Sequence, residues 1–99
     1  MLYAIIGEDA PESLEKRLAV RAEHLARLKE LADAGRLVLA GPFPAIDSPD
    51  PGPAGFAGSL IVAEFPSLEE AEVWAAADPY VTTGVFVRAN ILPFKHVLP

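Results

Sequence analysis

Residues 2–7 read LYAIIG, a continuous apolar run that is followed by the polar pair Glu8-Asp9. The length of the run and the glycine at its end predict a β-strand. Successive side chains of a strand point to opposite faces of its sheet. Both faces of this strand are apolar: Leu2, Ala4 and Ile6 lie on one face, and Tyr3 and Ile5 on the other. A sheet that contains this strand should therefore be covered on both sides.

The rest of the chain alternates between strand and helix patterns. Further strands are predicted over residues 36–43, 59–65 and 85–92, and helices over residues 11–34 and 67–78. Gly35 is expected to end the first helix and Pro79 the second. At the N-terminal ends, Asp9 with Glu12, or else Ser13, is expected to cap the first helix. Ser67 with Glu70 is expected to cap the second. The order strand–helix–strand–strand–helix–strand predicts a single α+β domain over residues 1–99, with a ferredoxin-like βαββαβ fold. Its antiparallel sheet would carry both helices on one face.

Two helices leave the second face of this sheet uncovered. Exposing about five large apolar side chains there would forfeit roughly 7–15 kcal/mol, which is as much as the whole stability of a typical domain. The simplest cover is a second copy of the chain, packed sheet on sheet about a two-fold axis. We therefore expect a homodimer of the dimeric α/β barrel type, with the long loop or the tail as the alternative cover.

Composition excludes several classes of protein. The net charge is −6, which argues against a nucleic-acid partner, and no cysteine is present for thiol chemistry or disulfides. The longest apolar runs are too short for a membrane span or a signal peptide, so a soluble cytoplasmic protein is predicted. With two distant histidines and no glycine-rich phosphate loop, we expect neither a metal nor a cofactor.

A proline-rich segment lies between the second and third strands. Residues 41–56 contain five prolines and three glycines, which rule out a regular helix or strand. A loop of this length is usually functional or disordered, and its prolines favour order. It could close over a site, or residues 42–56 could hold a neighbouring subunit in a higher oligomer. Asp47 and Asp50 within it are typical turn residues.

Basic side chains cluster on the first helix. At 100° per residue, its apolar stripe contains Leu14, Leu18, Leu25, Leu28 and Ala32. Arg21 falls inside this stripe, and Arg17 and His24 lie at its edge. These three residues are the cations predicted to face the sheet, whereas Arg27 is expected to be solvated.

Asp78 is the carboxylate predicted to face them from the second helix. At the C-terminal end of a helix it would oppose the dipole, a penalty of about 0.3–1 kcal/mol. Such a position needs a cationic partner, of which His24 is one candidate. The pair could simply tie the two helices together, or it could work as a general acid/base in which Asp78 orients the imidazole. Arg21 could then bind an anionic oxygen of the substrate.

Other candidates carry weaker signals. Tyr3 and Tyr80 either line a pocket or belong to the core, and Ser59 is a further candidate for substrate binding. His96 lies beside Lys95 in the tail and is expected to be solvated.

Across its whole length the chain resembles the YciI (YCII-related) family. The matching stretches are residues 1–65, ADPYV at 77–81, GVF at 84–86 and PFKHVLP at 93–99. The resemblance implies a ferredoxin-like domain that dimerises through its sheets, and a His–Asp dyad that maps onto His24 of RAEHL and Asp78 of ADPY. Many relatives carry proline at the position of Ala22, which leaves open that residues 14–19 form a separate short turn.

The resemblance also suggests a type of reaction. Some relatives are dehydrochlorinases, and the superfamily includes muconolactone isomerase, so the family implies cofactor-free proton transfer next to a carbonyl or phenol. We therefore expect a lyase or isomerase acting on a small cyclic or aromatic molecule, with His24 as acid/base and Asp78 as its partner. The alternatives are a ligand-binding or accessory module without catalysis, and a purely structural subunit.

Overall fold

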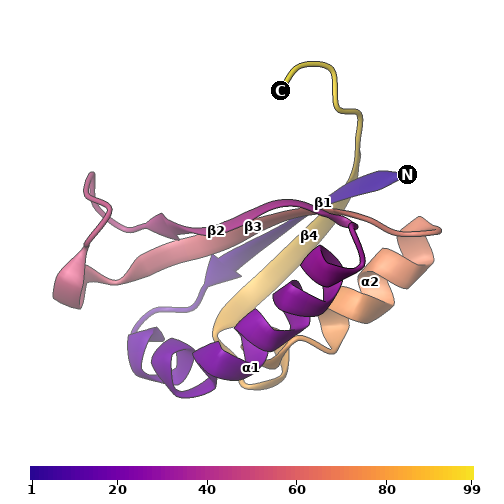
Figure 1. Ribbon diagram of the computed structural model, residues 1–99. Coiled ribbons are helices and arrows are strands. Elements are labelled where there is room, and N and C mark those ends of the chain that lie inside the picture. The colour runs from indigo at the N-terminus through magenta and orange to yellow at the C-terminus, as the bar shows by residue number, and fades with distance from the viewer.

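The computed structural model describes residues 1–99 and shows one antiparallel sheet with helices on one face (Figure 1). The strands are β1 (Leu2–Asp9), β2 (Leu37–Pro44), β3 (Phe56–Glu64) and β4 (Phe86–Phe94). The helices are α1 (Leu14–Asp33), α2 (Leu68–Ala76) and the short α3 (Pro79–Thr82), and a 3-10 turn η1 covers Gly52–Ala54. The strand order is β2-β3-β1-β4. The predicted ferredoxin-like α+β fold is therefore confirmed.

The hydrophobic core lies between the sheet and the helices. Its buried members are Tyr3, Ile5, Ile61, Ala63 and Phe65 from the sheet side, and Leu28, Leu31, Ala71 and Ala75 from α1 and α2. The alanines of α2 let that helix approach the sheet closely, since small side chains leave room for the rings of Tyr3 and Phe65. The core thus occupies the β1–β3 centre of the sheet and leaves β2 largely outside it.

The first helix differs from its prediction at its N-terminal end. It begins at Leu14 instead of Pro11, and Ser13 makes no side-chain capping hydrogen bond. The expected capping role of Asp9 is wrong because its carboxylate binds the side chain of Arg17. The helix runs unbroken past Ala22, so the separate turn suggested by the family resemblance is not formed.

The buried face of α1 is also rotated from the predicted leucine stripe. Its buried residues are Arg17, His24, Leu28 and Leu31, while Leu18 and Leu25 are exposed. Periodicity alone ranks a leucine above an arginine for burial, but two of the buried positions are polar residues with buried carboxylate partners. Those ion pairs turn the helix toward themselves and leave the leucines over the edge of the sheet.

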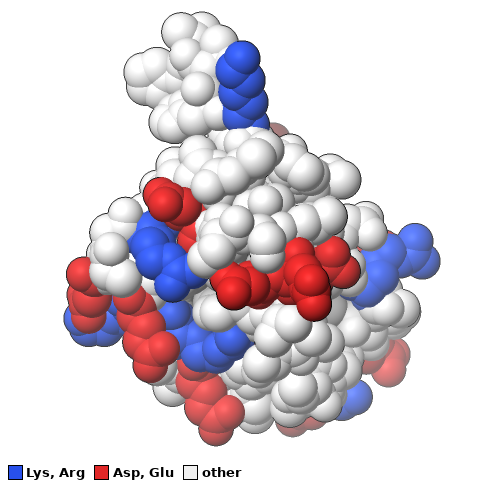
Figure 2. All heavy atoms as spheres, turned by 90° about the vertical axis from the view of Figure 1, so that its right-hand side faces the viewer, with Lys and Arg blue, Asp and Glu red and all other residues white.

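The second face of the sheet carries no helix. Its centre is buried at Ala4 and Val62, but its outer strands β2 and β4 are exposed. Leu39 of β2 and Leu92 of β4 are 49% and 53% exposed. The C-terminal tail does not fold back over this face, since Val97 and Leu98 are 74% and 79% exposed. Figure 2 shows the tail standing clear of the body and mostly free of charged side chains. The alternative in which the loop or tail covers the sheet is not what the structure shows.

None of the helices combines the length and the apolar character needed to cross a membrane.

One glycine of β1 is required by the packing of β4. A Cβ atom added at Gly7 would lie 2.4 Å from the ring of Phe86, whereas one added at Gly41 of β2 would meet nothing within 4 Å. We expect Gly7→Ala to lower the free energy of unfolding by about 1–3 kcal/mol, because the Phe86 ring has to leave its place. Gly41→Ala is the matched control and should change stability by less than about 0.5 kcal/mol. Urea denaturation measures both, and equal effects would contradict the steric explanation.

Candidate functional site

Asp78 lies in the two-residue link between α2 and α3. Helix α2 ends at Ala76, and Asp78 has extended backbone angles of φ −66° and ψ 134°. Its Oδ1 accepts a hydrogen bond of 2.8 Å from the backbone N–H of Tyr80, so Asp78 is the N-cap of α3, with Pro79 at the first helical position. The prediction that it opposes the dipole at the end of the second helix is wrong. Asp78 instead begins the next helix, where a carboxylate is favourable.

The imidazole of His24 meets this carboxylate from α1. His24 Nδ1 lies 2.9 Å from both oxygens of Asp78, and the side chains are only 6% and 4% exposed. The ring also stacks on Tyr80, with centroids 3.9 Å apart and an interplanar angle of 11°. These contacts hold the imidazole in one orientation. Its other nitrogen, Nε2, makes no hydrogen bond within the chain, and the residue lines a pocket.

Arg27 is a third partner of this cluster. Its Nη1 lies 3.3 Å from Asp78 Oδ2, Nη2 donates a 2.7 Å hydrogen bond to the carbonyl of Trp74, and the guanidinium lies 4.2 Å from the Trp74 ring centroid. The prediction that Arg27 is an ordinary solvated charge is therefore wrong. Helical periodicity misses it because its stem crosses the α1–α2 interface and its charged end turns back to Asp78.

Arg17 and Asp9 form a second buried ion pair. Arg17 Nε and Nη2 donate to the two Asp9 oxygens at 2.9 and 2.8 Å, and the side chains are 6% and 3% exposed. The same guanidinium donates to Ser59 Oγ at 2.9 Å and stacks over Phe56 and Tyr80. Sequence reasoning placed Arg17 toward the sheet but missed Asp9 as its partner. The spacing of eight residues across a turn carries no periodic signal for such a pair.

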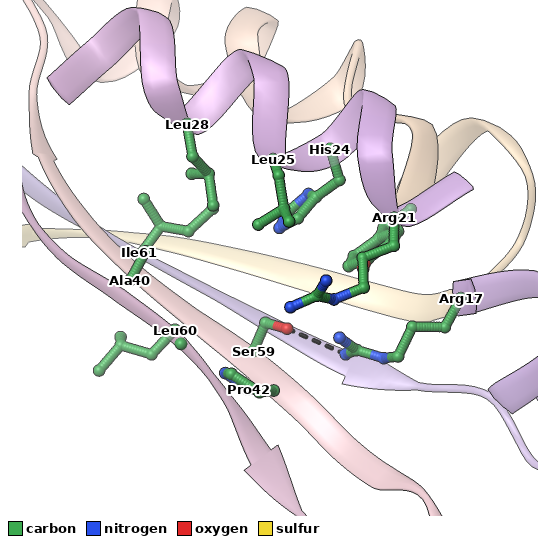
Figure 3. Close-up of a pocket in the computed structure, with 12 residues that line it drawn as sticks. Arg17, Arg21, His24, Leu25, Leu28, Ala40, Pro42, Ser59, Leu60 and Ile61 are labelled. Carbon is green, nitrogen blue, oxygen red and sulfur yellow. Dashed lines mark hydrogen bonds between the residues drawn. The ribbon is translucent and has the colours of Figure 1, made fainter. Parts of the chain in front are cut away.

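A pocket of about 200 Å³ opens between α1 and the β2–β3 hairpin (Figure 3). In Figure 3 Arg21, His24 and Leu25 of α1 point toward Ser59 and Pro42 on the sheet. The pocket is lined by Arg17, Arg21, His24, Leu25, Leu28, Ala40, Gly41, Pro42, Ser59, Leu60, Ile61 and Tyr80.

Most of the predicted site residues meet in this pocket. His24, Arg21, Ser59 and Tyr80 line it, and Asp78 supports it from behind through His24. Tyr3 does not belong to it, because Tyr3 lies in the hydrophobic core with its ring 6.4 Å from that of Phe65.

Sequence reasoning did not identify Leu25 and the β2 residues as pocket walls. No periodicity predicts this gap between α1 and the edge strand, since it results from the rotation of the helix.

Among the ionisable groups at the pocket, Tyr80 has a pKa that is shifted by its surroundings. Burial raises the pKa of the Tyr80 hydroxyl above its ordinary value of 10.0, and the charges of Arg17 and Arg21 oppose this shift only in part. Tyr80 is therefore a neutral phenol and a hydrogen-bond donor at neutral pH. Across residues 1–99 no group of three or more histidines, cysteines or acidic residues lies close enough to hold a metal ion.

The structure thus defines a ferredoxin-like α+β protein with a small basic pocket beside a buried histidine–aspartate contact. Residues 1–95 match the YCII-related domain, and the chain belongs to this family. It is 60% identical over 97 residues to Protein YciI of Escherichia coli O6:H1, which covers 98% of this chain and 99% of that protein. An uncharacterised protein of Haemophilus influenzae is 54% identical over the same shares of the two chains.

A solved structure extends the comparison to a named enzyme. The chain is similar to 5-chloro-2-hydroxyhydroquinone dehydrochlorinase (TftG) from Burkholderia phenoliruptrix AC1100, in complex with 2,5-dihydroxybenzoquinone. The two are 28% identical, with a TM-score of 0.84, over 98% of this chain and 96% of that one.

The buried Arg17–Asp9 ion pair should contribute more to stability than the exposed Glu8–Arg88 pair beside it. Asp9→Ala leaves a buried guanidinium without its counter-charge, so we expect a loss of about 3–5 kcal/mol in the free energy of unfolding. The double variant Asp9→Ala with Arg17→Met should recover part of it. Glu8→Ala is the control, because Glu8 pairs with Arg88 at the surface, where the side chains are mostly exposed, and should cost at most about 1 kcal/mol. Urea denaturation distinguishes these outcomes, and similar losses for Glu8 and Asp9 would contradict the structural role of the pair.

Tyr80 should make stability depend on pH in the alkaline range. In the unfolded chain its pKa is near 10.0, and in the folded chain burial raises the pKa. Below pH 10.0 the phenol is neutral in both states and adds no pH dependence. Above it, ionisation favours the unfolded chain, so stability is lost as the pH rises through the folded pKa.

Tyr80→Phe removes this contribution, so the variant should lose less stability than the wild type between about pH 9 and pH 11. Urea unfolding at a series of pH values measures the difference. Tyr3 and the lysines are shared by both proteins and cancel. Parallel pH profiles would show that Tyr80 ionises as it does in the unfolded chain.

Proposed function

We propose that this protein is a cofactor-independent lyase or isomerase that moves a proton on a small cyclic or aromatic substrate. The observation that carries the proposal is the position of His24 between Asp78 and the pocket. Its Nδ1 is within hydrogen-bond distance of the carboxylate, and its ring lines a cavity large enough for a small molecule. A histidine held in this way can act as a base or an acid near neutral pH.

The proposed step begins with the tautomer that carries its proton on Nδ1. Asp78 accepts this N–H, which leaves the lone pair of Nε2 free to accept a proton from a C–H or O–H of the bound ring. The electron pair left behind moves into the ring and onto one of its oxygens, and the positive charge of Arg21 stabilises the anionic ring. Asp78 stabilises the imidazolium that forms.

The second half of the reaction decides between the two classes. In an isomerase His24 returns the proton to another atom of the ring, and no group is lost. In a lyase the electron pair expels a leaving group such as chloride, and His24 later gives its proton to water. Neither course requires an oxidant, a reductant or a second substrate.

The similarity to the dehydrochlorinase supports this class of reaction. Dehydrochlorination removes a proton and a chloride ion from one molecule, which is the lyase course described above. The ligand in that structure, 2,5-dihydroxybenzoquinone, is a single ring that bears oxygen atoms. At 28% identity and a TM-score of 0.84 the resemblance covers nearly all of both chains.

The assembly we propose is a homodimer that packs the open faces of two sheets together. The support is the exposure of Leu39, Leu92 and Phe94 on a face that neither the loop nor the tail covers. Burying each such side chain against a second copy would stabilise the dimer by about 1.5–3 kcal/mol. The proline-rich loop extends beyond the sheet (Figure 1) and could add contacts in a higher oligomer.

The catalytic role can be tested with the substrate of the structural relative. We expect the wild type to release chloride from 5-chloro-2-hydroxyhydroquinone, as followed with a chloride electrode. His24→Gln should lower the rate by about 10²–10⁴-fold, the usual contribution of a general base. His96→Gln is the matched control, because His96 lies exposed in the tail, and should leave the rate unchanged.

The same variants separate the alternative functions. If the wild type binds 2,5-dihydroxybenzoquinone but releases no chloride from 5-chloro-2-hydroxyhydroquinone, catalysis is refuted for this substrate class. The protein then only binds such ligands. If His24→Gln retains the full rate, the assignment of His24 is wrong.

A further inference from the structure

The ionisable side chains that line the pocket include basic groups and no carboxylate. The basic side chains Arg17, Arg21 and His24 contribute to the wall, and no aspartate or glutamate does. Guanidinium groups donate hydrogen bonds and cannot accept them. This concentration of positive charge is unexpected in a chain whose net charge is −6.

Arg21 is the basic residue of the pocket whose charge is not neutralised within the chain. Arg17 is paired with Asp9, and the imidazole of His24 contacts Asp78. The salt bridges of the structure do not include Arg21. Its guanidinium points from α1 across the pocket toward Ser59 (Figure 3). The charge of Arg21 is therefore directed into the cavity and not toward a structural partner.

The two hydroxyl groups at the pocket add donors beside this charge. Ser59 Oγ already accepts a hydrogen bond of 2.9 Å from Arg17, so its own O–H is left to donate. Tyr80 remains protonated at neutral pH, because burial raises its pKa. Arg17 lies 4.7 Å from the ring centroid of Tyr80, and Arg21 points toward Ser59 (Figure 3), so these donors lie at one end of the cavity.

The apolar lining and the size of the cavity limit the rest of the ligand. Leu25 and Leu28 of α1 and Ile61 of β3 give part of the pocket an apolar surface. The volume is about 200 Å³, whereas a cavity of about 150 Å³ accommodates one benzene molecule. One six-membered ring with small substituents fits this space, and a fused pair of rings would extend beyond it.

We propose that the substrate is a single six-membered ring that carries an ionised oxygen, and that Arg21, with the hydroxyls of Ser59 and Tyr80, binds this oxygen. This inference rests on the proposed function, since it takes the pocket beside His24 as the substrate site. It adds to that function a charge that the substrate must carry, a limit on the size of the substrate, and the residue that selects for the charge. Arg21 is the specificity-determining residue, and Arg17 positions the Ser59 hydroxyl.

Two matched ligands test the charge requirement. 4-Hydroxybenzoate and 4-hydroxybenzamide have nearly the same shape. The first carries an ionised carboxylate where the second carries a neutral amide. Isothermal titration calorimetry of the wild type should show about tenfold or tighter binding of the carboxylate, the usual gain from a hydrogen bond to a charged group. This preference should decrease as the salt concentration rises, because Arg21 is exposed to solvent.

Two matched variants test the residue. Arg21→Gln should abolish the preference for the carboxylate and leave the affinity for the amide almost unchanged. Lys29→Gln is the control, since it removes the same charge from an exposed position of the same helix, where Lys29 pairs only with Asp33. Ser59→Ala should weaken carboxylate binding by a smaller factor. 6-Hydroxy-2-naphthoate tests the size limit and should bind more weakly than 4-hydroxybenzoate.

The outcomes separate this inference from the proposed reaction. Equal affinity of the wild type for acid and amide, no binding of either, or the same loss in Arg21→Gln and Lys29→Gln would overturn the anion site. Tighter binding of the naphthoate would overturn the size limit. A wild type that prefers the carboxylate through Arg21 but shows no turnover of any ring substrate would instead refute the reaction and leave the anion site standing.

Discussion

The carboxylate of Asp78 is the point at which the helical layer of this protein is held together. One oxygen caps α3 through the N–H of Tyr80, and both oxygens lie 2.9 Å from His24 on α1. Arg27 brings a guanidinium group within 3.3 Å. A buried carboxylate is tolerated only when donors replace the water it has lost. Here those donors come from separate elements, so satisfying one charge also fixes how α1 and α3 lie relative to each other.

The pocket is a consequence of how α1 is turned by its buried ion pairs. Arg17 and His24 occupy positions that a purely hydrophobic helix would give to leucine, and their partners lie on β1 and in the α2–α3 link. The leucine stripe is displaced toward the edge strand β2, where Leu25 forms part of a cavity wall. The protein thus gives up apolar burial on this helix and gains a cavity with donors at one end. That exchange is the usual relation between stability and function in small domains.

The two faces of the sheet have different tasks in this arrangement. The face under the helices holds the core and the pocket, and its close packing explains why Gly7 carries no side chain under Phe86. The other face is apolar and uncovered in the isolated chain. Because β2 contributes to the wall of the pocket, a second copy packed on the open face would also stiffen one side of the site. Assembly and ligand binding are then linked through the same strand.

Most of the fold could be predicted from the sequence. The order of strands and helices, the capping box at Ser67 and the helix end at Gly35 are local signals, because they depend on backbone geometry and on neighbours within a few residues. The two-sided apolar strands also predicted a face that the helices cannot cover. Helical periodicity left Arg17, Arg21 and His24 as possible partners of Asp78. It also placed Asp78 in the second helix, which in fact ends at Ala76. The pairing of His24 with Asp78 was expected from the family resemblance.

Other features were decided only by the tertiary structure. Local pattern places Asp9 at a helix cap and Arg27 in solvent, yet each forms an ion pair with a residue on another element. From the sequence, Tyr3 and Tyr80 were equally good candidates for lining a pocket. Packing placed Tyr3 in the core and Tyr80 against His24. Charge pairing acts through space over distances that no sequence period encodes. The sequence by itself therefore determined the order of the four strands and the two main helices, but not α3 or the extension of β2 and β3 into the proline-rich segment. Contacts between buried polar side chains on different elements decided how α1 is rotated and where a cavity remains.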